Sequence, residues 1–279
     1  VGSADGILCA IPAAGLRLRL SRSQPRSIIT PVIIYYVICK RSDNGYHAFM
    51  NKHSEFWDKE YGTSEHLALS DEPSEDLKKF CRFALRNYGR RFLNPLARVL
   101  DLGCGNGRNL VFLARSYGMR GVGYDISNEA IKLSRLASKN LPISYTVRSI
   151  EGALDLPDNS VDVVLDMMTS HFLKEKERGT LRAEILRVLK PGGWLFFKSF
   201  LLEGDLNARR LLKEHPADEK GAYIHPTLGV YEHVWTEESL REFFGPHFAI
   251  HKLERSHKHL KRGRAWKRRT VTAYLQKPF

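Results

Sequence analysis

The segment 99–108 constrains the fold more than any other part of this 279-residue chain. Its sequence is VLDLGCGNGR, in which an apolar run ends in an acidic residue and glycine then recurs at every second position. Glycines permit a tight turn and leave the backbone bare, so that a ligand can lie against it where a Cβ would collide. The segment therefore predicts a buried strand, a ligand-binding turn and the start of a helix.

Strand-like and helix-like segments alternate along the chain on both sides of this turn. We expect strands at 97–102, 121–126, 143–148, 161–168 and 194–200, and helices at 109–117, 128–138 and 174–189, with a turn at 190–193. Such alternation is typical of a parallel sheet covered by helices on both faces. Two further strands, 248–256 and 270–275, have a turn at 261–264 between them, and a short connection joins only antiparallel neighbours. The expected fold class is α/β: a doubly wound, seven-stranded, mostly parallel sheet with a terminal antiparallel strand, a Rossmann-like arrangement.

The chain divides into an N-terminal extension, 1–49, and one domain, 50–279. The extension combines scattered arginines with an apolar run at 28–39. Four interpretations stay open for it: a poorly ordered tail, translated sequence upstream of a natural start at Met50, a targeting segment or a β-hairpin.

The domain is expected to begin with a helical cap, 50–95, which contains a helix at 51–61 and a second helix that starts after its N-cap residue Ser74. A connection at 201–235 is longer than is usual in compact domains, which predicts a lid over the site. Thr236 is expected to cap a helix at 237–244.

The formal net charge of +13 resides in the two ends of the chain, 1–49 and 251–279, because 50–250 holds equal numbers of basic and acidic residues. The C-terminal excess lies between the last two expected strands, at the ligand-binding edge of the sheet. A basic patch with an aromatic residue suits phosphate-rich partners such as RNA. It equally suits a solvated loop or the steering of a small anion. The basic side chains that RNA would use are Arg262, Arg264, Lys267, Arg268 and Arg269.

A second acidic residue, Asp125, ends the next strand in the sequence GVGYDIS. One strand beyond a glycine-rich turn, a carboxylate can hold the two hydroxyls of a ribose. The glycine spacing here is Gly-x-Gly-x-Gly, which differs from the G-x-G-x-x-G of dinucleotide-binding turns. The two features together indicate a ligand that contains a ribose.

Residues 99–275 resemble the class I S-adenosylmethionine-dependent methyltransferases. Five features carry the resemblance in order: the glycine turn 101–107, Asp125, LPDNSVD at 156–162, KPGG at 190–193 and the final reversed strand pair. The resemblance implies a methyltransferase enzyme of Rossmann-like fold whose cofactor is S-adenosylmethionine. Its implied cofactor-binding residues are Asp101, Gly103, Cys104, Gly105, Gly107, Asp125, Ile126, Ser149, Ile150, Glu151 and Asp166.

Particular roles follow from the same resemblance. Asp101 is expected near the cofactor's ammonium group, the three glycines 103, 105 and 107 under its methionine part, and Asp125 on its ribose. Ile126 would pack on the adenine, and either Ser149 or Glu151 would meet the adenine amino group.

The methyl acceptor is expected beside 166–171, the residues that follow the fourth strand. They differ from the Asn/Asp-Pro-Pro-Tyr of adenine-amino methyltransferases. Asp166 and His171 are the catalytic candidates; His171 is either a general base or a packing residue, and Asp166 either lines the site or caps the backbone. The acceptor-binding candidates in the lid are Tyr223, His225, Tyr231 and His233, and Phe56, Trp57 and Tyr61 either close over the cofactor or pack in the interior.

We expect methyl transfer to an oxygen, nitrogen or sulfur atom of a small-molecule acceptor. The alternatives are RNA methylation and a non-catalytic binding module. Four scattered cysteines without a C-x-x-C pair argue against a disulfide framework or a zinc site. No apolar run approaches the roughly 20 residues that a membrane span requires. These observations predict a cytoplasmic protein with no metal and no membrane partner, and they leave the oligomeric state open.

Overall fold

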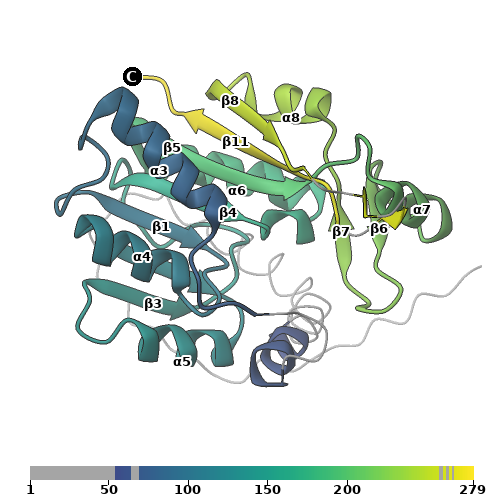
Figure 1. Cartoon of the computed structure of the whole chain (residues 1–279), viewed down its shortest axis with the longest axis horizontal. Helices are drawn as coiled ribbons and strands as arrows, with labels where there is room; N and C mark the ends of the chain where they lie inside the picture. Colours follow the sequence, from purple (N-terminus) through teal and green to yellow (C-terminus); the bar gives the residue numbers. More distant parts are fainter. Residues whose placement is uncertain (1–53, 64–68, 258–259, 262–263, 266) are drawn as a thin grey trace, which may run out of the picture. The chain divides into compact units, whose positions relative to one another are not determined.

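The computed structural model describes residues 54–63, 69–257, 260–261, 264–265 and 267–279, which belong to one compact unit, Ala48–Phe279. The expectations for 1–49 lie outside the described residues. Seven strands form one sheet, in the spatial order β3 (Ile143–Val147), β2 (Arg120–Asp125), β1 (Arg98–Leu102), β4 (Val161–Met167), β5 (Leu189–Phe200), β11 (Thr270–Gln276) and β8 (Ala249–Arg255) (Figure 1). Strands β1–β5 pair in parallel, and β11 is antiparallel to both β5 and β8. The predicted fold class is confirmed.

Helices cover both faces of the sheet because its strands are apolar on both sides. Helices α3 (Glu75–Tyr88), α4 (Arg108–Tyr117) and α5 (Asn128–Ala137) lie on one face, and α6 (Glu175–Val188) and α8 (Glu237–Phe244) on the other (Figure 1). In β5, Trp194 and Phe196 pack into the core under α3, whereas Leu195 and Phe197 pack into the core under α6 and α8. Each buried side chain of this size contributes about 1.5–3 kcal/mol. The strand ends are therefore held rigidly.

Both predicted residues occupy N-cap positions, but in the described structure the Thr236 side chain makes a capping hydrogen bond and the Ser74 side chain does not. Ser74 precedes α3, and the predicted apolar positions of that helix, Leu77, Phe80, Cys81 and Ala84, are buried. Thr236 accepts a hydrogen bond from the Ser239 N–H at 3.0 Å, and Ser239 Oγ accepts one from the Thr236 N–H. A helix also occupies 54–63, within and just beyond the expected 51–61.

The expected turn at 190–193 forms part of strand β5 instead. Gly192 has a φ of 74°, and the pairing register between β4 and β5 shifts between Val161 and Val163. The Gly192 N–H donates to the Lys277 carbonyl oxygen at 3.0 Å. The glycines therefore make an irregularity in the first part of β5, ahead of the residues that pair with β11, and Lys277, which follows β11, hydrogen-bonds to them.

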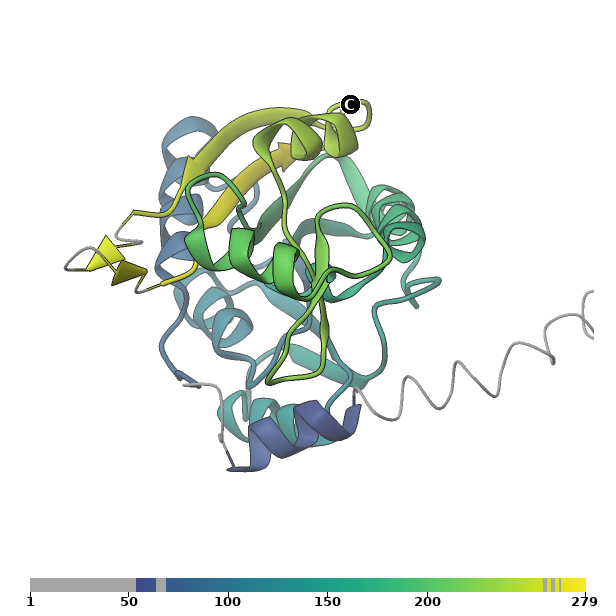
Figure 2. The ribbon, with the colours of Figure 1, turned by 90° about the vertical axis from the view of Figure 1, so that its right-hand side faces the viewer.

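The long connection after β5 contains α7 (Leu206–Glu214) and the antiparallel pair β6 (Ala222–Ile224) and β7 (Tyr231–His233). Figure 2 shows these elements in front of the carboxyl ends of the parallel strands. They have a small core of their own, formed by Ala208, Leu211, Tyr223 and Val234. The part of the connection after β8 forms a short antiparallel pair, β9 (Leu260–Lys261) and β10 (Arg264–Ala265). Strand β8 runs parallel to β1–β5, so its carboxyl end lies at the same edge of the sheet as theirs. The pair β9–β10 follows β8 at that edge, as predicted.

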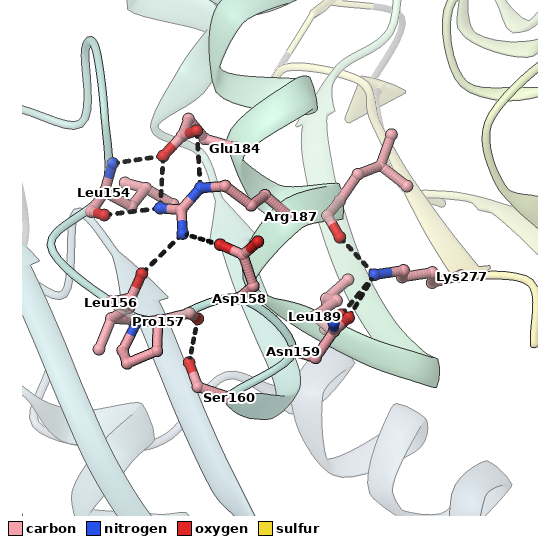
Figure 3. Close-up of polar contacts among 11 residues, drawn as sticks. Leu154, Leu156, Pro157, Asp158, Asn159, Ser160, Glu184, Arg187, Leu189 and Lys277 are labelled. Carbon is pink, nitrogen blue, oxygen red and sulfur yellow. Dashed lines mark hydrogen bonds and ion pairs between the residues drawn. The ribbon is translucent and has the colours of Figure 1, made fainter.

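Arg187 of α6 holds the loop that leads into β4 (Figure 3). Its guanidinium group donates to the carbonyl oxygens of Leu154 and Leu156 at 2.8 Å and pairs with Asp158 and Glu184 at 2.7 Å. Close by, Lys277 Nζ donates to the Asn159 side chain and to two carbonyl oxygens of the α6–β5 junction. The LPDNSVD segment is therefore a structural brace for β4.

Candidate active site

A cavity of about 380 Å³ opens at the carboxyl ends of β1, β2 and β4, a volume in the range of small-molecule and cofactor sites. The lining of its β1–β2 end includes Tyr61, Asp101, Gly103, Cys104, Gly105, Asp125, Ile126, Arg148, Ser149, Ile150 and Glu151. The lining of its β4–β5 end includes Trp57, Ser74, Asn109, Met167, Met168, Thr169, Phe172, Leu173 and Lys198. Most of the predicted cofactor-binding residues therefore meet in one place.

The glycine turn has the backbone that only glycine adopts readily. Gly103 and Gly105 have φ values of 67° and 55°. A Cβ at Gly103 would collide with Thr169, and one at Gly105 would collide with the Tyr61 hydroxyl. The missing Cβ atoms thus let Thr169 and Tyr61 pack closely against the turn, and both glycines line the cavity.

Asp125 lies at the end of β2 and is 7% exposed. Its two carboxylate oxygens accept the Gly105 N–H at 2.8 Å and the Ser127 N–H at 2.9 Å. Burial nevertheless raises the pKa of Asp125 above its usual range. Each carboxylate oxygen has capacity for a second hydrogen bond, so the group can accept from a ligand while it braces the turn.

Asp101 is 2% exposed and lines the same end of the cavity. Its Oδ2 has no hydrogen-bond partner within the described part of the chain. Burial and the nearby Asp125 carboxylate raise the pKa of Asp101 to about 8. A buried carboxyl group without a partner at a cavity wall can bind a cationic group of a ligand, which would supply the missing hydrogen bond.

Comparison with known proteins agrees with this geometry. Residues 100–197 match the family model described as a methyltransferase domain. The chain is 25% identical to a solved SAM-dependent methyltransferase from Methanosarcina mazei, with a TM-score of 0.57 over 68% of this chain and 96% of that one. Residues 100–197 are a methyltransferase domain, and the chain has the fold of the class I S-adenosylmethionine-dependent methyltransferases. S-adenosylmethionine is the cofactor of that family, and the glycine turn and the unpartnered Asp101 fit it.

Two curated relatives place this methyltransferase among enzymes of varied substrates. It is 31% identical over 140 residues to the glycine/sarcosine/dimethylglycine N-methyltransferase of Actinopolyspora halophila, covering 49% of this chain and 24% of that protein. It is 32% identical over 160 residues to the phthiotriol/phenolphthiotriol dimycocerosates methyltransferase 1 of Mycobacterium ulcerans, covering 56% and 53%. The chain thus spans about half, or less, of the length of these relatives.

Not all of the predicted cofactor-binding residues at the β1–β2 end line the cavity. Cys104, Ile126, Ser149, Ile150 and Glu151 line it, but Gly107 does not. Gly107 instead caps α4, with a φ of 78°, and packs against the Tyr145 hydroxyl. The Ser149 hydroxyl oxygen accepts the Glu151 N–H at 3.0 Å, which holds these two adenine candidates together.

The helix 54–63 supplies two aromatic walls. Trp57 and Tyr61 line the cavity, whereas Phe56 does not. Asp58 of this helix accepts hydrogen bonds from the Ser127 hydroxyl at 2.6 Å and from the Glu129 N–H at 3.2 Å. This contact between 54–63 and the start of α5 carried no local sequence signal.

The two catalytic candidates lie outside the lining, which corrects their expected placement. Asp166 accepts the Ser170 N–H at 3.1 Å, so it caps the turn after β4, and burial raises its pKa to about 6. His171 is 2% exposed and lies beside the rings of Phe172 and Phe200. Burial lowers the pKa of His171 to about 3, so it is a neutral packing residue here. Their neighbours Met167, Met168 and Thr169 do line the cavity.

The four lid candidates also lie outside the lining. The Tyr223 hydroxyl donates to Glu232, and the Tyr231 hydroxyl donates to Glu219. His225 Nδ1 accepts the Leu228 N–H at 3.2 Å. His233 is 6% exposed, and burial lowers its pKa to about 3. These side chains hold the lid together instead of facing the cavity.

The basic connection, the segment 256–269 between β8 and β11, has both exposed and half-buried side chains among its described residues. Arg268 pairs with Asp205 at 3.0 Å and lies 4.0 Å over the Phe200 ring. The Arg269 N–H donates to the same Asp205 carboxylate at 2.8 Å. Lys267 is exposed, and the side chains of Arg262 and Arg264 lie outside the described residues. Arg268 is therefore held against the lid by Asp205 and does not project freely from this segment.

In the part of the chain that the structure describes, no cluster of three or more histidine, cysteine, aspartate or glutamate side chains has the arrangement of a metal site. No helix of the same residues is long and apolar enough to span a membrane.

Proposed function

We propose that this protein transfers a methyl group from S-adenosylmethionine to an oxygen, nitrogen or sulfur atom of a small-molecule acceptor. The single observation that carries the proposal is the continuity of the cavity. The glycine turn and the two buried carboxyl groups form one end, and the segment after β4 forms the other. A methyl donor bound at the first end would present its methyl group toward the second.

Each residue at the β1–β2 end would bind a different part of the cofactor. Asp101 would pair with the ammonium group, Gly103 and Gly105 would lie beside the methionine part, and Asp125 would accept hydrogen bonds from the ribose hydroxyls. Ile126 would pack on the adenine, with Ser149 or Glu151 at its amino group. The cofactor, when bound, supplies a methyl group that its sulfonium already activates.

The protein's contribution is then alignment and the exclusion of water. Trp57 and Phe172 form an aromatic wall, with ring centroids 5.3 Å apart. Among the described residues that line the β4–β5 end, neither a histidine nor a carboxylate is present. We infer that the acceptor atom needs no histidine base and reacts in the form in which it binds.

A small acceptor is favoured over RNA by two observations. The relatives are named for glycine derivatives and a phthiotriol lipid, both small molecules. In the basic connection, which would be the contact surface for RNA, Arg268 forms an ion pair with the buried Asp205.

Calorimetric titration with S-adenosylmethionine and S-adenosylhomocysteine tests the cofactor site. We expect Asp125→Ala to weaken both affinities by about tenfold or more, because a buried charge-assisted acceptor is lost. Asp155→Ala, at an exposed position outside the cavity, is the matched control and should bind as wild type does. Absence of binding to the wild-type protein would refute the proposal.

Turnover is tested separately with a radiolabelled methyl donor and fractionated cell extract. Label in small metabolites is the expected result. Label confined to RNA or protein would contradict the small-molecule acceptor, and binding without any transfer would indicate a binding module.

A further inference from the structure

Lys198 brings a positive charge to the β4–β5 end of the cavity. It lies near the carboxyl end of β5, in register with Met167 of β4, and its carbonyl oxygen accepts the Met168 N–H at 2.9 Å. Its side chain is 20% exposed and lines the cavity. Lys198 is the basic residue among those given above for this end, and the cavity as a whole is also lined by Arg108 and Arg148.

The ammonium group of Lys198 shares its counter-ion with a second lysine. Asp76, in the first turn of α3, pairs with Lys198 at 2.7 Å through one oxygen and with Lys79 at 3.0 Å through the other. Asp76 thus pairs with two lysines, of which Lys79 also interacts electrostatically with Glu254. Lys79 is 51% exposed and lies outside the lining, so the enclosed face of this cluster is the Lys198 ammonium group.

The lining of the β4–β5 end combines the polar residues Ser74, Asn109 and Thr169 with apolar ones. Trp57 and Phe172 form one wall, and Met167, Met168 and Leu173 add further apolar surface. Such walls bury a hydrocarbon or aromatic body, at roughly 25 cal/mol per Å² of surface removed from water. A charged group placed beside such apolar surface fixes the ligand's orientation. Charge-assisted hydrogen bonds are roughly twice as strong as neutral ones.

We propose that the methyl acceptor is an organic carboxylate with an apolar body, and that Lys198 binds its carboxylate group and so selects the acceptor. This inference rests on the proposed function. Lys198 anchors the acceptor without taking part in methyl transfer, and the apolar walls hold the rest of the molecule.

The experiment compares carboxylic acids with their neutral amides of the same shape. Wild-type protein saturated with S-adenosylhomocysteine is titrated by calorimetry and ligand-observed NMR with three pairs: indole-3-acetate and indole-3-acetamide, 4-phenylbutyrate and its amide, and octanoate and its amide. We expect the acid of at least one pair to bind about tenfold more tightly than its amide.

Variants connect this preference to Lys198. Lys198→Met should abolish the acid preference while the affinity for S-adenosylhomocysteine, which also reports folding, stays at the wild-type value. Lys198→Arg should keep the preference. Lys79→Met is the matched control, because it removes the other lysine from Asp76 but lies outside the cavity, and it should keep most of the preference. Asp76→Asn should strengthen acid binding, because Lys198 then no longer shares its charge.

The outcomes separate this inference from the proposed function. Failure of the wild-type protein to bind S-adenosylhomocysteine would overturn both. Normal cofactor binding with no acid preference in any pair, whether both members bind or neither does, would overturn only the carboxylate acceptor. An acid preference that survives in Lys198→Met would also overturn the role of Lys198.

Discussion

Asp101 and Asp125 are both buried beside the glycine turn, and they differ in their hydrogen-bond partners. Asp125 accepts two backbone N–H groups, whereas Oδ2 of Asp101 has no partner in the described residues. Burial and the proximity of Asp125 raise the pKa of Asp101 to about 8. The free protein therefore keeps the Asp101 carboxyl mostly protonated at neutral pH.

Cofactor affinity should consequently depend on pH. A bound ammonium group favours ionised Asp101, so binding at about pH 7 should release a proton. Lower pH stabilises the protonated carboxyl of the free protein. We therefore expect affinity for S-adenosylhomocysteine to fall as the pH decreases below about 8, by up to about tenfold per unit. Calorimetry in two buffers of different ionisation enthalpy measures both the affinity and the number of protons released on binding.

Asp101→Asn is the control for this prediction. It should bind the cofactor more weakly, without proton release and with little pH dependence over the same range. A wild-type affinity that is constant from about pH 6 to pH 8 would contradict the role of Asp101.

At the residue scale, the sequence identified the parts of the site that are local in the chain. The glycine turn and Asp125 were found because a strand, a turn and a helix must follow one another there. Lys198 was missed, because its place in the cavity depends on packing between distant segments. Tyr61 was predicted only as one of two alternatives, closing over the cofactor or packing in the interior, and it lines the cavity. The lid candidates failed for a related reason, since packing against α7 decides which way a three-residue strand turns its side chains.

At the scale of elements, the helix 54–63 is attached to the start of α5. Asp58 accepts the Ser127 hydroxyl hydrogen and the Glu129 N–H, and the same helix carries Trp57 and Tyr61 to the cavity wall. The sequence predicted the helix from its own composition. It could not predict the attachment, because the two segments lie about 70 residues apart.

Loss of this attachment should speed cofactor release. Removing a side chain that caps a helix N-terminus costs about 0.5–2 kcal/mol. We therefore expect Asp58→Ala to raise the dissociation rate of S-adenosylhomocysteine by about three- to tenfold, measured by stopped-flow tryptophan fluorescence in a chase experiment. Glu55→Ala, at an exposed position on the same helix, should leave the rate unchanged. Equal rates for the two variants would show that Asp58 does not hold the helix in place.

At the scale of the whole described molecule, alternation of strands and helices was sufficient to predict the sheet, its order of layers and the reversed strand β11. Hydrophobic periodicity determines those features, and each is confirmed. The role of the basic connection was not predictable from composition. Whether an arginine faces solvent or a buried carboxylate depends on where the lid packs, and no short-range pattern encodes that.

Arg268 links this connection to the lid, and its removal should destabilise the protein. Asp205 is fully buried, and Arg268 also donates to the Tyr223 hydroxyl at 2.7 Å. Breaking a buried ion pair from one side costs about 3–5 kcal/mol, because the remaining charge stays buried. We expect Arg268→Met to lower the free energy of unfolding in urea by that order, whereas Lys213→Met, at an exposed position on α7, changes it little. Equal stability of the two variants would mean that Arg268 is free to meet a partner, and the RNA alternative would then regain its main contact residue.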